Sequence, residues 1–169
     1  MLTVRSGLRL ADVFWPSFVE RDGVFLLAYV RPPEGPPGSH GSLTEYERFH
    51  GHTHIQQLFR WNVPTVYDSE LELDRPNPSA PEHLASWTLT KRLAEMWMAK
   101  LQRDSPAYRF RVCASRLDDP IIHFHRVRDD EPVWISDENA AQGIAEDTFV
   151  VFDSDAISRK LSTRHANER

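Results

Sequence analysis

Cysteine is almost absent from this chain: Cys113 is the only one among 169 residues. A single cysteine excludes an intrachain disulfide and a cysteine-rich zinc site. The same scarcity agrees with a reducing, cytoplasmic location. Apolar residues make up 40% of the sequence, so a chain of this length can bury enough surface to fold without covalent or metal cross-links.

Long apolar runs are also missing. The N-terminal stretch MLTVRSGLRLADVFW has no apolar run of signal-peptide length, and no window approaches the roughly 20 apolar residues of a transmembrane helix. The sequence also lacks a glycine-rich phosphate-binding loop and the Gly-x-Ser-x-Gly turn of many hydrolases. We therefore expect a soluble cytoplasmic protein without membrane contact, in which no strong motif identifies an enzyme.

Positive charge is in short supply, with 20 Lys and Arg against 25 Asp and Glu, which gives a formal net charge of −5. Segment 154–169 carries four cations against two carboxylates, so residues 1–153 carry −7. We do not expect such a body to bind nucleic acid, because that binding depends on clustered cations. A basic protein partner suits it better.

Several segments have the pattern of strands joined by hairpins. Asp22-Gly23 is a strong hairpin signal and predicts strands at about 12–20 and 24–30. The proline- and glycine-rich segment 31–41 then predicts a loop. One or two strands follow Pro64, and alternation predicts a hairpin over 108–128. A short helix and a last strand near 148–152 complete the pattern.

Two helices are predicted between these strands. The longer one covers about 80–103, with Ser79 and Glu82 spaced as a capping box and Pro81 in the first turn. The shorter one starts at about 43, where Ser42 and Glu45 repeat the capping-box spacing. The predicted fold class is therefore α+β, with both helices packed on a mainly antiparallel sheet. We expect a single domain over 1–153 and a flexible tail over 154–169.

The predicted buried stripe of the longer helix has a helical period. It consists of Leu89, Leu93, Met96, Trp97 and Leu101. The polar residues of this helix, including Lys91, Arg92, Glu95 and Lys100, are expected to face solvent.

The stretch FHGHTHI is the first candidate site. If the helix from Ser42 runs through Gly51, His50 and His54 share a face near Glu47, while His52 points to solvent. Gly51 weakens that helix by about 1 kcal/mol relative to alanine, so it can also end at His50. In a strand, all three histidines would share a face. Two imidazoles and a carboxylate suit a divalent transition metal such as zinc. The alternative is that these rings simply pack and hydrogen-bond.

The hairpin over 108–128 carries the second candidate site. If Tyr108, Phe110, Val112, Ile122 and Phe124 face the core, the opposite face gathers a different set. That set is Arg109, Arg111, Cys113, His123 and His125. The two arginines suit an anion, and His123 and His125 become further metal ligands if they meet the first cluster. Cys113 beside a histidine could act as a nucleophile, or it is a small buried residue.

The leading functional expectation is a small acidic protein that acts by protein–protein binding, as a regulator or inhibitor of a partner. The alternative is a metal-dependent hydrolase that uses Glu47, His50, His54, His123 and His125. A weaker alternative is an anion or nucleic-acid binder that uses Arg109 and Arg111. The three differ in cofactor, because only the hydrolase needs a divalent transition metal.

Overall fold

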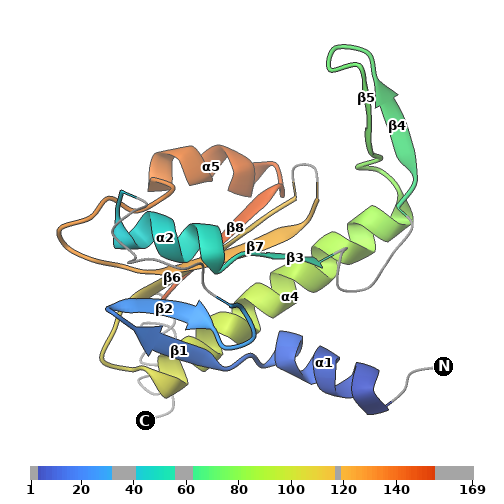
Figure 1. Ribbon diagram of the computed structural model, residues 1–169. Coiled ribbons are helices and arrows are strands. Elements are labelled where there is room, and N and C mark those ends of the chain that lie inside the picture. The colour runs from blue at the N-terminus through green and yellow to red at the C-terminus, as the bar shows by residue number, and fades with distance from the viewer. Residues whose placement is uncertain (1–3, 32–40, 56–62, 117–118, 155–169) are drawn as a thin grey trace, which may run out of the picture.

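A computed structural model of the chain describes residues 4–31, 41–55, 63–116 and 119–154. Four α-helices and eight β-strands lie within these ranges (Figure 1). The helices are α1 (Val4–Phe14), α2 (Leu43–His50), α4 (Pro81–Asp104) and α5 (Asp137–Ala145). The strands are β1 (Phe18–Arg21), β2 (Val24–Leu27), β3 (Thr53–His54), β4 (Thr65–Asp68), β5 (Leu73–Pro76), β6 (Phe110–Ser115), β7 (Ile121–Arg126) and β8 (Phe149–Asp153). The α+β class with antiparallel sheets is confirmed.

The main sheet has four strands in the order β3-β7-β6-β8, and every pairing is antiparallel. The predicted hairpin forms its centre, with Val112 opposite Phe124 and Cys113 opposite His123. Side chains alternate across a strand, so the core face and the opposite face of this hairpin are the predicted ones. Phe110, Val112, Ile122 and Phe124 all belong to the main core.

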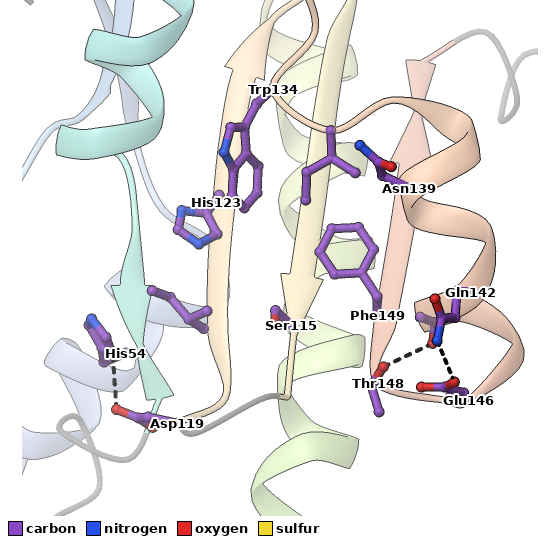
Figure 2. A pocket seen from close by; sticks show the side chains of 13 residues that line it. His54, Ser115, Asp119, His123, Trp134, Asn139, Gln142, Glu146, Thr148 and Phe149 are labelled. Carbon is purple, nitrogen blue, oxygen red and sulfur yellow. Dashed lines mark hydrogen bonds and ion pairs between the residues drawn. The ribbon is translucent and has the colours of Figure 1, made fainter. Parts of the chain in front are cut away.

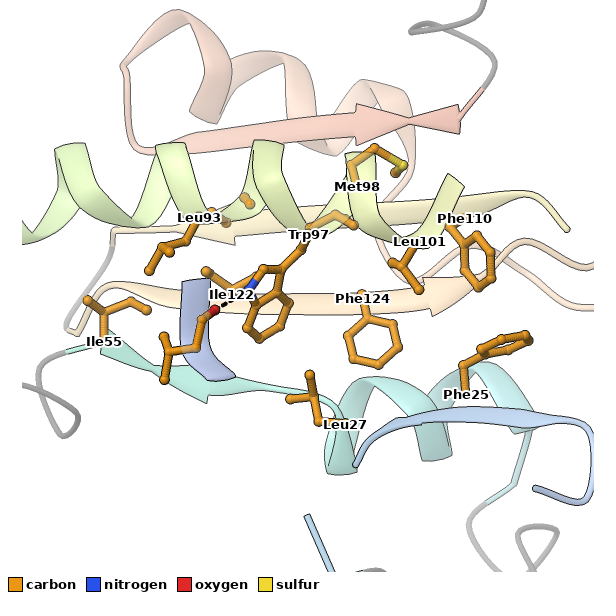
Figure 3. Close-up of a cluster of buried hydrophobic side chains, with 14 of the residues drawn as sticks. Phe25, Leu27, Ile55, Leu93, Trp97, Met98, Leu101, Phe110, Ile122 and Phe124 are labelled. Carbon is orange, nitrogen blue, oxygen red and sulfur yellow. Dashed lines mark hydrogen bonds between the residues drawn. The ribbon is translucent and has the colours of Figure 1, made fainter. Parts of the chain in front are cut away.

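Helix α4 covers the core face of the sheet (Figure 3). Leu93, Trp97 and Leu101 of the predicted stripe are fully buried, while Leu89 and Met96 are only half-buried. The predicted capping box is wrong: Ala80 is the N-cap residue and makes no side-chain cap, although Pro81 does begin the helix. Lys100 is also buried rather than solvent-facing, because its ammonium is paired with Asp104 at 2.5 Å and lies over the Trp15 ring.

The N-terminal region differs from the sequence prediction. Residues 4–14 form helix α1, so the strand predicted at about 12–20 is wrong for its first part, and β1 spans only Phe18–Arg21. The cause is tertiary: Val13 is buried in the main core, and its carbonyl accepts a hydrogen bond from the Trp97 indole at 2.8 Å. The Asp22-Gly23 turn is confirmed, with positive φ at both residues.

Helix α2 is anchored to its neighbours by a buried ion pair. Ser42 caps it as predicted, accepting from the Glu45 amide, and Glu131 accepts from the Leu43 and Thr44 amides. The Glu47 carboxylate meets the Arg128 guanidinium at 2.8 and 2.9 Å and accepts from the Phe25 and Arg126 amides at 2.7 Å. Glu47 therefore joins α2 to β2 and β7.

The hairpin of β4 and β5 forms a two-stranded sheet of its own. Figure 1 shows it projecting from the end of α4, away from the other elements. Most of its side chains are exposed. We call residues 64–78 the arm.

Helix α5 lies on the face of the sheet opposite α4, where it packs against β8 (Figure 1). A small second core, formed by Cys113, Ala140 and Phe149, fills part of this space. The hairpin face that carries Cys113 and His123 is therefore covered by protein. None of the described helices has the length and apolar character needed to cross a membrane. Of the loop predicted over 31–41, residues 32–40 lie outside the described residues, and so do residues 155–169 of the tail predicted over 154–169.

Candidate active-site pocket

A cavity of about 610 Å³ lies between α5 and the sheet face opposite α4 (Figure 2). Its floor is apolar and includes Ile121 of β7, Phe149 of β8 and Ile135 from the loop before α5. Its polar groups come from both sides, with His54 of β3 at one edge and Asn139 of α5 at the other. A concave, largely apolar site of this size with a few convergent polar groups is typical of small-molecule binding.

His54 and Asp119 form a hydrogen-bonded pair at the edge of this pocket. The His54 Nδ1 and the Asp119 Oδ2 lie 2.9 Å apart, and both side chains are partly exposed. The pairing follows from the sheet: His54 lies opposite Ile121, and the Ile55 amide donates to the Pro120 carbonyl. The other carboxylate oxygen of Asp119, Oδ1, is buried and accepts no hydrogen bond from the described part of the chain.

His123 lines the pocket from β7, and its surroundings keep it neutral. Burial lowers the pKa of His123 to about 3. Its ring centroid lies 5.7 Å from that of His52 and 4.6 Å from the nearest Trp134 ring. Its Nδ1 atom is buried and has no hydrogen-bond partner within the described ranges. His123 therefore does not carry charge near neutral pH.

Trp134 closes the end of the pocket near His123, as Figure 2 shows. The Arg48 guanidinium lies 5.1 Å from the centroid of its ring. This cation–π contact from α2 helps to hold the indole in place. A flat, immobilised ring at a pocket wall offers a stacking surface to a planar ligand.

The charged groups of the pocket are of one sign. Asp119 and Glu146 contribute carboxylates, and none of the described lining residues is a lysine or an arginine. Gln142 donates to Glu146 at 3.0 Å and Asp119 is paired with His54, so the Asn139 amide is the polar group that α5 offers to a ligand. The electrostatics favour an uncharged or cationic ligand over an anionic one.

The histidines that were grouped by spacing come together only in part: His52 lies near His54 and His123, whereas His50 packs against Tyr46. Helix α2 ends at His50 and is capped by Gly51, so His50 and His54 do not share a helical face. The His50 ring lies 4.4 Å from the Tyr46 ring, while His54 lies in β3. His52, expected to be solvated, has its ring 5.2 Å from that of His54 and donates from Nδ1 to the Phe49 carbonyl at 2.5 Å.

Glu47, the carboxylate of the predicted metal site, is bound by other groups of the protein. Glu47 is fully buried, which raises its pKa, while Arg128 and two backbone amides act in the opposite direction. Four hydrogen bonds occupy its carboxylate. His125 is also buried, and burial lowers its pKa to about 4. Within the described ranges, no three His, Cys, Asp or Glu side chains are arranged to hold a metal ion.

The two arginines predicted to bind an anion are paired with carboxylates of the chain. Arg109 is exposed and pairs with Asp129. Arg111 is buried, and its guanidinium meets Asp153 at 2.8 and 2.9 Å and Asp137 at 2.9 Å. These contacts tie β6 to β8 and to the start of α5.

Cys113 faces the second core, opposite His123 as predicted. Burial raises the pKa of its thiol to about 12. The reactive thiolate is therefore scarce at neutral pH, and the geometry favours a packing role.

The comparisons with known proteins supply no relative. No protein-family model matches the chain, and no curated protein or solved structure is similar to it.

Several pocket residues were not predicted from the sequence. Asp119, Trp134 and Glu146 lie far from His54 along the chain and reach it only through the β3–β7 pairing and the return of α5. Trp134 stands just before the Ser136-capped helix, but its position in the sequence indicates no partner for the ring.

Proposed function

We propose that the pocket between α5 and the sheet binds an uncharged or cationic small molecule with a flat apolar portion, and that His54 acts there as a general base. The observation that carries this proposal is the His54–Asp119 pair at the edge of a cavity with an apolar floor. A base oriented by a carboxylate is the arrangement that activates water or a hydroxyl nucleophile in many hydrolases.

The proposed chemistry follows from the direction of one hydrogen bond. When the His54 Nδ1–H donates to Asp119, the lone pair lies on Nε2 and can accept a proton from a bound water. Asp119 then stabilises the imidazolium that forms. The water oxygen forms a bond to a carbonyl carbon of the ligand. The bond from that carbon to the ester oxygen or amide nitrogen then breaks as the proton held on Nε2 passes to that atom, which releases a carboxylic acid and an alcohol or amine.

The ligand class follows from the walls. The two carboxylates repel an anion, the Trp134 ring stacks on a planar group, and Ile121 and Phe149 favour apolar contact. An aromatic ester or amide that is neutral or carries one positive charge fits these features best.

Binding is tested with three probes of similar size and different charge: benzamidine, benzamide and benzoate. NMR titration of the full chain should show saturable shifts of the Trp134 indole and the His54 and His123 imidazoles, with benzamidine bound roughly tenfold more tightly than benzoate. Ile121→Trp should abolish these shifts by filling the pocket. Benzoate binding as tight as benzamidine, or shifts that persist in Ile121→Trp, would contradict the proposed ligand class.

The base is tested without knowing the substrate. Long-range ¹H–¹⁵N NMR should find His54 as the Nδ1–H tautomer at neutral pH, and Asp119→Asn should remove that preference, while Asp129→Asn, a matched surface change, should not. In a panel of neutral and cationic aromatic esters, His54→Gln should lower kcat/KM by about 10²-fold or more. An Nε2–H tautomer in the wild type would overturn the role of His54 as the base.

A further inference from the structure

The arm, residues 64–78, exposes apolar side chains that the protein does not cover. Tyr67 is 66% exposed and Leu71 is 56% exposed, and Val66 and Leu73 are also exposed. An isolated two-stranded hairpin is at best marginally stable in water, and contiguous exposed apolar surface is typical of interaction sites. The arm therefore has the features of a binding surface for another molecule.

The charge of the arm narrows the choice of partner. It carries four carboxylates, from Asp68, Glu70, Glu72 and Asp74, against the single cation of Arg75. Asp68 is used internally: it accepts from the Glu70 and Leu71 amides and pairs with Arg75 at 3.0 Å. The other three carboxylates are exposed. A second copy of this acidic chain would place like charges together, so a basic partner is favoured.

The backbone of the arm also has open pairing positions. The sheet has only two strands, so the outer edge of β4 pairs with no described strand. The β4 segment contains no proline, whereas Pro76 interrupts the donors of β5. A cavity of about 490 Å³ runs beside this hairpin, lined by Tyr67, Glu70 and Pro78 among others.

We propose that the arm is a docking site for an extended basic segment of a partner protein, which adds to the β4 edge and alternates Lys or Arg with apolar residues. Main-chain hydrogen bonds supply affinity in such strand addition, and alternate side chains supply specificity. Because side chains alternate across a strand, the cations lie on the face of Tyr67 and Asp74, and the apolar residues cover Val66 and Leu73 on the opposite face. This surface is separate from the pocket under α5, and it supplies the protein-binding function that the acidic composition favours.

The test uses fluorescein-labelled eleven-residue peptides that alternate Lys–Val, Lys–Ser or Glu–Val, titrated against the full chain by fluorescence anisotropy. The Lys–Val peptide should bind at least about tenfold more tightly than either control peptide, because only it matches both the charge and the apolar residues. If the Lys–Val and Lys–Ser peptides bind equally well, apolar contact does not contribute to binding and that part of the proposal is wrong. If the Glu–Val peptide binds as well as the Lys–Val peptide, attraction between opposite charges does not contribute and that part is wrong.

Matched variants locate the peptide on the arm. Glu70→Lys/Asp74→Lys and Tyr67→Ser/Leu71→Ser should each weaken Lys–Val binding by about tenfold or more. Glu95→Lys/Glu138→Lys makes the same charge change on exposed helix positions and should have little effect. If Glu95→Lys/Glu138→Lys weakens binding as much as Glu70→Lys/Asp74→Lys, the peptide is attracted by the net charge of the whole protein and the arm is not the binding site. A dimer on sizing that Tyr67→Ser/Leu71→Ser dissociates would show a second copy as the occupant and overturn the proposal.

Discussion

At the scale of single residues, the environment decides the chemistry of each ionisable side chain. His54 sits at a pocket edge against Asp119, whereas His123 and His125 are buried and have pKa values lowered to about 3 and about 4. Glu47 was grouped with these histidines by spacing, yet its carboxylate is held by Arg128 and two amides. Spacing along the chain shows which residues can share a face of a helix or strand. The fold determines which side chains are actually in contact with each of them.

The effect of replacing Gly51 on stability also depends on the atoms that surround it in the fold. Helix propensity favours alanine over glycine by about 1 kcal/mol, but a Cβ atom at Gly51 would lie 2.5 Å from the Glu47 carbonyl oxygen and 2.7 Å from the Phe124 ring. We therefore expect Gly51→Ala to lower the free energy of unfolding by about 1–3 kcal/mol through overpacking, measured by urea denaturation.

The matched control is Gly7→Ala in α1, where a Cβ atom would have no heavy atom within 4 Å. This change should raise the free energy of unfolding by up to about 1 kcal/mol, because alanine restricts the unfolded chain. Opposite signs for the two variants are the expected result. A stabilising Gly51→Ala would show that the close approach of Phe124 to α2 is not needed.

At the scale of elements, local signals were sufficient where the local pattern was strong. The Asp22-Gly23 turn, the Ser42 cap, the 108–128 hairpin and the long helix were all predicted close to their observed bounds. Helix α1 was missed because Val13 and Trp97, 84 positions apart, fix it against α4. The pocket was missed for the same reason, since the sequence does not reveal that β3 pairs with β7.

The arm is the element that depends least on the remainder of the chain. Its ends are already together, since the Asn77 amide donates to the Pro64 carbonyl at 2.7 Å. Replacing residues 65–76 by a short Gly-Ser loop should therefore change the free energy of unfolding by no more than about 1 kcal/mol, because little buried apolar surface is lost. The same replacement should abolish binding of the Lys–Val peptide. A loss of several kcal/mol in urea denaturation would show that the arm stabilises the domain.

At the scale of the whole molecule, ionisable groups buried in their neutral form couple folding to pH. His123 and His125 lie on the face of β7 that is covered by α2, α5 and the loop before α5, so they remain neutral while the protein is folded. Once unfolded, each histidine titrates near its ordinary value of about 6.5. The unfolded state therefore binds more protons than the folded state between the lowered and the ordinary pKa values.

This difference in the number of bound protons determines whether stability rises or falls with pH. The stability that these two histidines contribute is fully present above about pH 6.5 and is lost as the pH falls toward the folded pKa values of about 4 for His125 and about 3 for His123. Each histidine contributes a slope of at most about 1.4 kcal/mol per pH unit. His83, whose pKa burial also lowers, adds in the same direction. Urea denaturation between about pH 5 and pH 7.5 should show stability rising with pH.

The contribution of one residue is separated by His125→Phe, which keeps a buried ring that takes up no proton. This variant should reduce the slope over that pH range by up to about 1.4 kcal/mol per pH unit, whatever its stability at pH 7.5. The pKa values of Asp104, Asp147 and Glu131 are lowered by hydrogen bonds and ion pairs, and their ordinary values lie below this range, so these carboxyl groups contribute little to the slope. The raised pKa of Glu47 acts in the opposite direction and flattens the slope. An unchanged slope in His125→Phe would mean that His125 takes up its proton in the folded protein, and that the covered face of β7 admits water.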